Sequence, residues 1–125
     1  MSMDLAVTSL LDELDALTWA RLQTTNSEPG SDKYTISVTY GGYREEYAFG
    51  ATRKFQTLDV SLFTKVPSSE MFAKIQAINE VVTADRRRGG YAQSSTINAW
   101  EADENIINEG AKLLTTIEIQ IQETN

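Results

Sequence analysis

The sequence contains no cysteine and no histidine. Without cysteine the chain can form neither a disulfide framework nor a thiolate metal site. Without histidine it lacks the commonest general base and the imidazole ligand of most transition-metal sites. The two absences disfavour an enzyme, and they leave open only sites built from carboxylates, hydroxyl groups or lysine.

Long apolar runs and a basic leader are also missing. No window reaches the ~18 consecutive apolar residues of a membrane helix. The first 13 residues carry three acids and no base, unlike the basic start of a secretory signal. We therefore expect a soluble protein that is made and kept in a reducing cytoplasm and has no membrane partner.

Positive charge is scarce, with 11 Lys and Arg against 18 Asp and Glu and a net charge of -7. Because phosphate contacts supply most nucleic-acid affinity, this balance disfavours general DNA or RNA binding. One segment differs from the rest, since Arg86, Arg87 and Arg88 are adjacent and precede Gly89-Gly90. The triplet has three interpretations: a contact with a neighbouring subunit or partner, a cationic last turn at the negative end of a helix dipole, or a DNA contact. We favour the first, and DNA is the least favoured.

The 125 residues, 41% of them hydrophobic, fit one domain spanning 1–125. Two segments have helical periodicity. In residues 3–17 leucine and valine recur every three or four positions behind Ser2 as N-cap, and a second such pattern begins at Met71, after Pro67 and a capping Ser68 or Ser69. Gly89-Gly90 then predicts a left-handed stop to the second helix near 83–88.

Period-two alternation predicts the strands. They are 34–40, ended by a turn at Gly41-Gly42; 55–66; 91–100; and 111–122, with a possible short strand in 19–25. Residues 26–32 are predicted to form a turn. Tyr34, Ile36, Val38 and Tyr40 share one apolar face, as do Leu58, Val60, Leu62 and Val66, while Thr57, Asp59, Ser61 and Lys65 point the other way. Strands with one apolar face and two amphipathic helices predict an α+β domain, a mostly antiparallel sheet with both helices packed on one face.

The segment 43–54 is polar and poorly periodic, and we expect either a long loop or an extended hairpin arm. It combines aromatic residues with arginines in the composition of a protein contact surface. The residues that we assign to this contact surface are Tyr43, Arg44, Tyr47, Phe49 and Arg53.

A second polar segment, 101–110, is acidic. Its spacing matches no EF-hand loop, so we expect a solvated turn without a metal ion. Glu101, Asp103 and Glu104 are instead candidates for meeting the arginine triplet of a neighbouring subunit. We find no catalytic constellation, no phosphate-binding glycine motif and no cofactor site.

The order of these elements resembles the tail terminator proteins of long-tailed bacteriophages. RRRGGYAQSSTINAWEADEN followed by GAKLLTTIEIQIQ carries most of the resemblance, and RKFQTLDVSLFTKV is similar to the family's long strand. The resemblance covers nearly the whole chain and rests on element order, because the family has no short catalytic signature.

The resemblance implies a structural, non-enzymatic virion protein that assembles into a ring, usually a hexamer, on the head-proximal end of the tail tube. The ring would end tube polymerisation and join the head connector or a head-closure protein, with DNA passing only through its lumen. An acidic lumen would not retain the passing duplex. Two alternatives remain: a head-closure or head–tail adaptor protein, and a small nucleic-acid-binding domain using the arginines.

Overall fold

The computed structural model describes residues 1–25, 33–65, 70–103 and 111–124. Its elements are α1 (Met3–Asp15), β1 (Arg21–Gln23), β2 (Tyr34–Ala48), β3 (Ala51–Thr64), α2 (Met71–Ala84), the 3-10 turn η1 (Arg88–Gly90), β4 (Ser94–Ile97), β5 (Glu101–Ala102) and β6 (Ala111–Thr124). Three predicted features lie outside the described residues: the turn at 26–32, Val66, and the acidic turn from 104 to 110. The predicted serine cap of the second helix is wrong, because the N-cap of α2 is Glu70, whose side chain makes no capping hydrogen bond.

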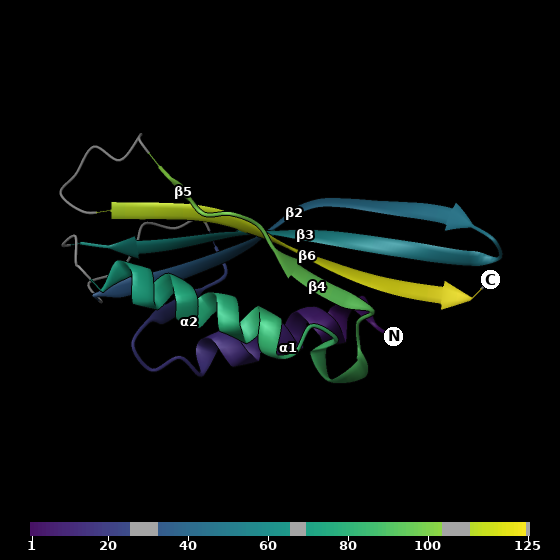
Figure 1. Cartoon of the computed structure of the whole chain (residues 1–125), viewed down its shortest axis with the longest axis horizontal. Helices are drawn as coiled ribbons and strands as arrows, with labels where there is room; N and C mark the ends of the chain where they lie inside the picture. Colours follow the sequence, from purple (N-terminus) through teal and green to yellow (C-terminus); the bar gives the residue numbers. More distant parts are fainter. Residues whose placement is uncertain (26–32, 66–69, 104–110, 125) are drawn as a thin grey trace.

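The strands form one sheet in the order β1-β2-β3-β6-β4, with β5 pairing to β6 beyond β4. All pairs are antiparallel except β1 with β2. Both helices pack on the same face of this sheet (Figure 1), which confirms the predicted α+β architecture. The opposite face, called here the helix-free face, carries no helix in the described part of the chain.

The hydrophobic core fills the space between the helices and one face of the sheet. Alternate residues of β3 and β6 point into it, among them Leu58, Leu62, Ile117 and Ile119. The helices contribute Ala6, Val7, Leu10, Leu14, Ile78 and Val82. Each fully buried aliphatic side chain stabilises the fold by about 1.5–3 kcal/mol. The period-two and period-3.6 patterns of the sequence therefore meet in a single core.

The start of α1 agrees with the sequence, whereas both helix ends differ slightly. Ser2 is the N-cap, and its side-chain oxygen accepts a hydrogen bond from the Leu5 amide at 3.3 Å. The helix ends at Asp15, two residues before the predicted limit. α2 ends at Ala84, so the arginine triplet lies beyond the helix and not in its last turn.

The predicted turn at Gly41-Gly42 is wrong. β2 runs through both glycines to Ala48, and its register against β3 shifts between Tyr40 and Tyr43. Such a shift is a bulge, at which extra residues are accommodated by bending the strand, and glycine favours it. A Cβ on Gly41 would lie 3.1 Å from the carboxylate of Asp59, which explains why a residue without a side chain fits there.

The segment 43–54 is an ordered hairpin, so of the two expected forms the extended hairpin arm is the correct one. We call residues 43–54 the hairpin arm. Its two strands pair residue by residue up to Ala48 and Ala51, and β6 pairs along the other side of β3 as far as Thr124. The arm extends well past the helices, to the right of Figure 1. β3 consequently begins at Ala51, four residues before the predicted start.

The predicted strand at 91–100 is shorter than expected. Only Ser94–Ile97 forms β4, and pairing with β6 resumes at Glu101. Between these points the chain turns toward α2, where the Trp100 indole N–H donates to the Asn79 side-chain oxygen at 2.9 Å. The half-buried indole thereby gains a hydrogen-bond partner at the point where regular pairing with β6 is interrupted.

Candidate functional site

Arg88, one of the three arginines assigned to a partner contact, lies inside the protein. Its side chain is 0% exposed. The Nε atom donates to the carbonyl of Asp85 at 2.6 Å, and Nη2 donates to the carbonyl of Val81 at 2.9 Å. Nη1 lies 3.2 Å from the carboxylate of Glu13 on α1. Assigning Arg88 to a subunit contact was wrong, because its charge is held within one chain.

The hydrogen bonds of Arg88 show which groups its positive charge stabilises. The carbonyls at the end of a helix have no intrahelical partner and carry the negative end of the helix dipole. Arg88 returns to these carbonyls from beyond the helix and then reaches α1. Nη1 makes no hydrogen bond of good geometry, so its pairing with Glu13 is electrostatic. One arginine thus joins the end of α2 to α1.

The backbone around Arg88 is left-handed. Arg88 has φ of +50°, followed by Gly89 at +67° and Gly90 at +94°. Glycine adopts this conformation freely, whereas another residue loses roughly 1–2 kcal/mol. The predicted left-handed glycines are present, but the left-handed run starts one residue earlier, at the arginine. The three interactions of its guanidinium offset this strain.

Arg86 and Arg87 are the two arginines of the triplet that remain at the surface. Neither takes part in an ion pair with another residue of the described ranges. Two cationic side chains are therefore available beside the end of α2. Their assignment to a partner contact stays a prediction.

The aromatic side chains of the hairpin arm are strongly exposed. Tyr47 is 70% exposed, and Phe49 at the tip is 107% exposed. Phe49 and Gly50 form the two-residue turn and both have positive φ, +50° and +75°. Hairpin turns of this kind normally use asparagine, aspartate or glycine at both positions. A phenylalanine there is strained, and the strain holds an aromatic ring in solvent.

One carboxylate joins the two tyrosines of the arm. The hydroxyl of Tyr43 donates to Glu45 at 2.8 Å, and that of Tyr47 donates to the other oxygen of Glu45. These two hydrogen bonds, with that of Tyr47 the larger cause, lower the pKa of Glu45 from its ordinary value. Bonds to the charged form favour it. The three side chains therefore form a rigid row on the helix-side face of the arm.

Arg44 is used within the opposite face of the arm. Its guanidinium lies 3.9 Å from the ring centre of Phe55, and Nη1 is 2.8 Å from Glu118 of β6. Nε is 3.4 Å from Glu46. A guanidinium stacked on a ring and paired across two strands stiffens the sheet. Arg53 is exposed on the same face, directly opposite Glu46 in the strand register.

The acidic candidates occupy different positions. Glu101 is exposed in β5, directly opposite Leu114 of β6. Asp103 lies 3.8 Å from Lys112 of its own chain. Glu104 lies outside the described residues. Their predicted role toward a neighbour's arginines is thus untested, and part of the acidic charge is already paired within the chain.

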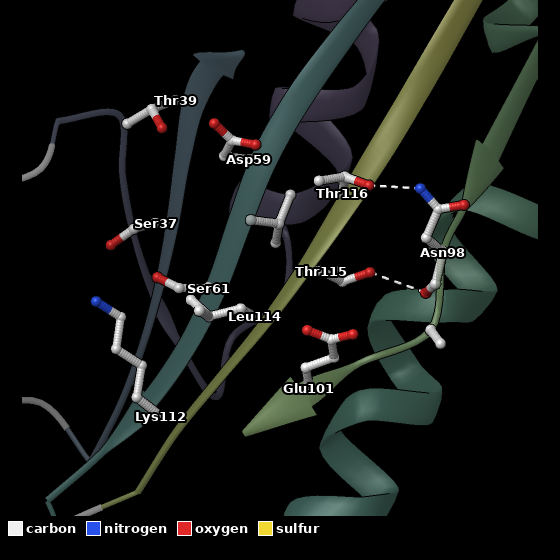
Figure 2. A pocket seen from close by; sticks show the side chains of 12 residues that line it. Ser37, Thr39, Asp59, Ser61, Asn98, Glu101, Lys112, Leu114, Thr115 and Thr116 are labelled. Atoms are coloured by element: carbon white, nitrogen blue, oxygen red, sulfur yellow. Dashed lines mark hydrogen bonds between the residues drawn. The ribbon is translucent and has the colours of Figure 1, made fainter. Parts of the chain in front are cut away.

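A polar groove lies on the helix-free face, over the half of the sheet opposite the arm (Figure 2). Its volume is 440 Å³. The floor comes from β2, β3 and β6, and one wall comes from residues 98–101. The polar groups that line it include Ser37, Thr39, Asp59, Ser61, Glu101 and Thr116. We call this the polar groove.

Hydrogen bonds fix the wall of the groove. The Asn98 side-chain amide donates to the hydroxyl of Thr116, and the hydroxyl of Thr115 donates to the Asn98 carbonyl (Figure 2). Leu114 is the apolar patch of the floor, with 38% of its side chain exposed. The groove thus offers two acidic groups, several hydroxyls and one leucine to a ligand.

Sequence reasoning did not identify this groove. The sequence did indicate a polar sheet face, because Asp59 and Ser61 were assigned to the face turned away from the core. What the sequence could not provide is the register that places them beside Ser37 and Thr116. Tyr40 was also misplaced. It shares the face of Leu58 as predicted, but it is 67% exposed, whereas Leu58 in the adjacent strand is buried.

Comparisons with known proteins add no identity: no family model matches the sequence, and a search of curated proteins returns no significant match. Neither helix of the described ranges has the length and apolar character to span a bilayer. Within those same ranges no three histidine, cysteine or acidic side chains come together as a metal site would require.

Proposed function

We propose that this chain is a structural virion subunit of the tail-terminator type. It assembles into a ring on the head-proximal end of a tail tube, ends tube polymerisation and offers a surface for head joining. The observation that carries this proposal is the hairpin arm, which projects beyond the helices and holds three aromatic side chains, Tyr43, Tyr47 and Phe49, in solvent.

An arm of this kind is more typical of a subunit of an assembly than of a monomeric protein. Exposed aromatic side chains at the centre of a contact supply much of the binding energy in protein complexes. The arm is also rigid, because β6 backs it and Arg44 stacks on Phe55. A rigid arm loses little conformational entropy when it binds.

The order of elements supports the terminator type in particular. A helix, a short strand, two long strands, a second helix and closing strands follow one another along the chain. This is the order on which the resemblance to tail terminators rests. The net charge of -7 is compatible with a ring whose lumen conducts DNA without retaining it.

The test is to add the purified chain to isolated tail tubes and to polymerising tube protein. We expect ring-shaped density at one end of each tube in electron micrographs, and shorter tubes in the polymerisation assay. Tubes of unchanged length without end density would refute the proposal.

A matched pair of variants identifies the surface responsible. Tyr47 on the arm and Phe72 on α2 are both 70% exposed, so truncating either removes a similar aromatic surface. We expect Tyr47→Ala to weaken ring or tube association and Phe72→Ala to leave it unchanged. Equal effects of the two variants would show that the arm is not the contact surface.

A further inference from the structure

Two features of the chain have complementary chemistry and lie far apart on the same sheet. One is the tip of the hairpin arm, with Phe49 and Arg53. The other is the polar groove, with Leu114, Asp59 and Glu101. We propose that the tip of one copy docks into the polar groove of a neighbouring copy, which makes the groove the subunit-joining site of the assembly.

The tip cannot reach the groove of its own chain. Both lie along β3, the tip at Ala51 and the nearest groove residue at Asp59. Eight residues of extended strand separate them, about 26 Å at the usual rise of a strand. Since β3 is paired on both sides between these points, it cannot fold back. An arm tip that enters this groove therefore belongs to another copy of the chain.

Charge favours a second copy as that occupant. Within the described residues, Asp59 and Glu101 take part in no ion pair, whereas the groove's lysine, Lys112, is paired with Asp103. On the arm, Glu46 is paired with Arg44, and Arg53 has no ion pair in the same described ranges. Among the described residues, the groove therefore presents two carboxylates without an ion pair, and the tip presents one arginine without an ion pair. Such a match both attracts and orients the partners.

The apolar parts match as well. Phe49 is the most exposed aromatic side chain of the described chain, and Leu114 is the exposed leucine on the groove floor. An aromatic anchor on an apolar patch, bordered by polar groups, is the usual form of a strong contact. The strained turn at Phe49 then has a reason, because it holds the ring ready to bind.

The contact joins two different surfaces, so it is heterologous. Heterologous contacts build a ring when the rotation closes and a filament when it does not. This inference rests on the proposed function only in taking a second copy of the chain as the occupant. A ring is the closed outcome that the proposed function requires.

Cross-linking tests the contact directly, because the natural sequence contains no cysteine. Ala48→Cys places a thiol beside the tip without removing Phe49 or Arg53, and Thr39→Cys places one in the groove. Mixing the two single variants under mild oxidation should give disulfide-linked dimers on a non-reducing gel. The control replaces Thr39→Cys by Ala73→Cys, an exposed position on α2, and should give none.

Charge exchange provides a second measurement. We expect Arg53→Glu or Asp59→Lys alone to lower the association constant in sedimentation equilibrium by about tenfold or more. The association constant of the chain with both changes should recover, since the new carboxylate at position 53 of one copy can then pair with the new ammonium group at position 59 of the next. If the double variant associates no better than the single variants, the pairing of Arg53 with Asp59 is wrong.

The outcomes separate this inference from the proposed function. If light scattering shows a ring but the Ala48→Cys and Thr39→Cys variants form no disulfide, the docking is wrong and the terminator role remains. A cross-linked ring that does not bind tail tubes supports the docking and refutes the terminator role. Failure to cross-link at any concentration up to the solubility limit overturns the docking, and tube binding by the same sample then decides the function. If Asp59→Lys weakens binding to tail tubes but does not change association between copies, the groove holds the tube protein instead.

Discussion

The arginine triplet allows a sharp test of how burial decides the role of a residue. Three adjacent arginines are replaced by alanine one at a time: Arg86→Ala, Arg87→Ala and Arg88→Ala. The chemical change is identical in each case. Only Arg88 is buried, whereas its two neighbours are exposed. Any difference in the free energy of unfolding therefore reports the environment and not the residue type.

The expected magnitude follows from the contacts of Arg88. The substitution removes two hydrogen bonds to helix-end carbonyls and the pairing with Glu13. It also leaves a cavity, whereas the strain of the left-handed backbone is unchanged because arginine and alanine both carry a Cβ. Each hydrogen bond to a charged group is worth about 1.5–3 kcal/mol, so the loss of two costs about 3–5 kcal/mol, and the pairing with the half-exposed Glu13 adds less. An exposed substitution changes stability by about 0.5 kcal/mol or less. Arg88→Ala thus loses a large share of the roughly 5–15 kcal/mol that a domain has.

Urea unfolding followed by tryptophan fluorescence measures the difference. With a slope of about 2 kcal/mol per molar urea, the midpoint of Arg88→Ala should fall by roughly 1.5–2.5 M. The midpoints of the other two variants should stay close to that of the unmodified chain. All samples need one protein concentration, because assembly would shift the apparent stability.

A second substitution keeps the test informative if Arg88→Ala does not fold. Glu13→Gln removes the charge opposite Nη1 but leaves Arg88 and its two hydrogen bonds in place. We expect a loss of about 1–3 kcal/mol, because the buried guanidinium loses its counter-charge but keeps its two hydrogen bonds to carbonyls. Equal stabilities for the three alanine variants, or an unchanged Glu13→Gln, would refute the assignment of Arg88 to the interior.

Three further predictions concern other parts of the chain. In Tyr47→Phe the pKa of Glu45 should rise toward its ordinary 4.5, as followed by NMR titration of its carboxyl carbon; no change would contradict the hydrogen-bonded row. Because this pKa is lowered on folding, the contribution of Glu45 is present above its ordinary pKa and is lost as pH falls through the lowered value, which amide exchange in the arm should report. Phe49→Asn should raise the melting temperature of the unassembled chain by relieving a strain of about 1–2 kcal/mol, and a lower melting temperature would count against that strain. Ile117→Ala should cost about 2–5 kcal/mol in urea unfolding, and a loss below 1 kcal/mol would show that this site is poorly packed.

Much of the fold was already encoded in local patterns. The alternation at Leu58, Leu62, Ile117 and Ile119 predicted the buried face of the sheet, and these residues form the core. The helical spacing behind Ser2 predicted α1 and its cap. Such patterns suffice because a strand repeats every two residues and a helix every 3.6, so burial of one face leaves a readable trace.

The arm was only partly predictable. Gly41-Gly42 carried the usual signal of a turn, but pairing with β3 both before and after the glycines kept the chain extended through them. Propensity is a weak local preference, and neighbouring strands override it when they supply backbone hydrogen bonds. Phe49 at a left-handed turn position has no sequence signal at all, because phenylalanine is unfavourable there.

The sequence alone therefore determined the class of fold, the two layers and the residues that fill the core, because these depend on periodicity within single segments. Only the tertiary structure decided which arginine of the triplet is buried, that the arm is an ordered projection, and that a polar groove exists. Each of these depends on contacts between residues distant in the chain, such as Arg88 with Glu13 and Ser37 with Ser61. Three identical neighbouring side chains look alike in a sequence, and only packing distinguishes the one whose charge must be satisfied inside.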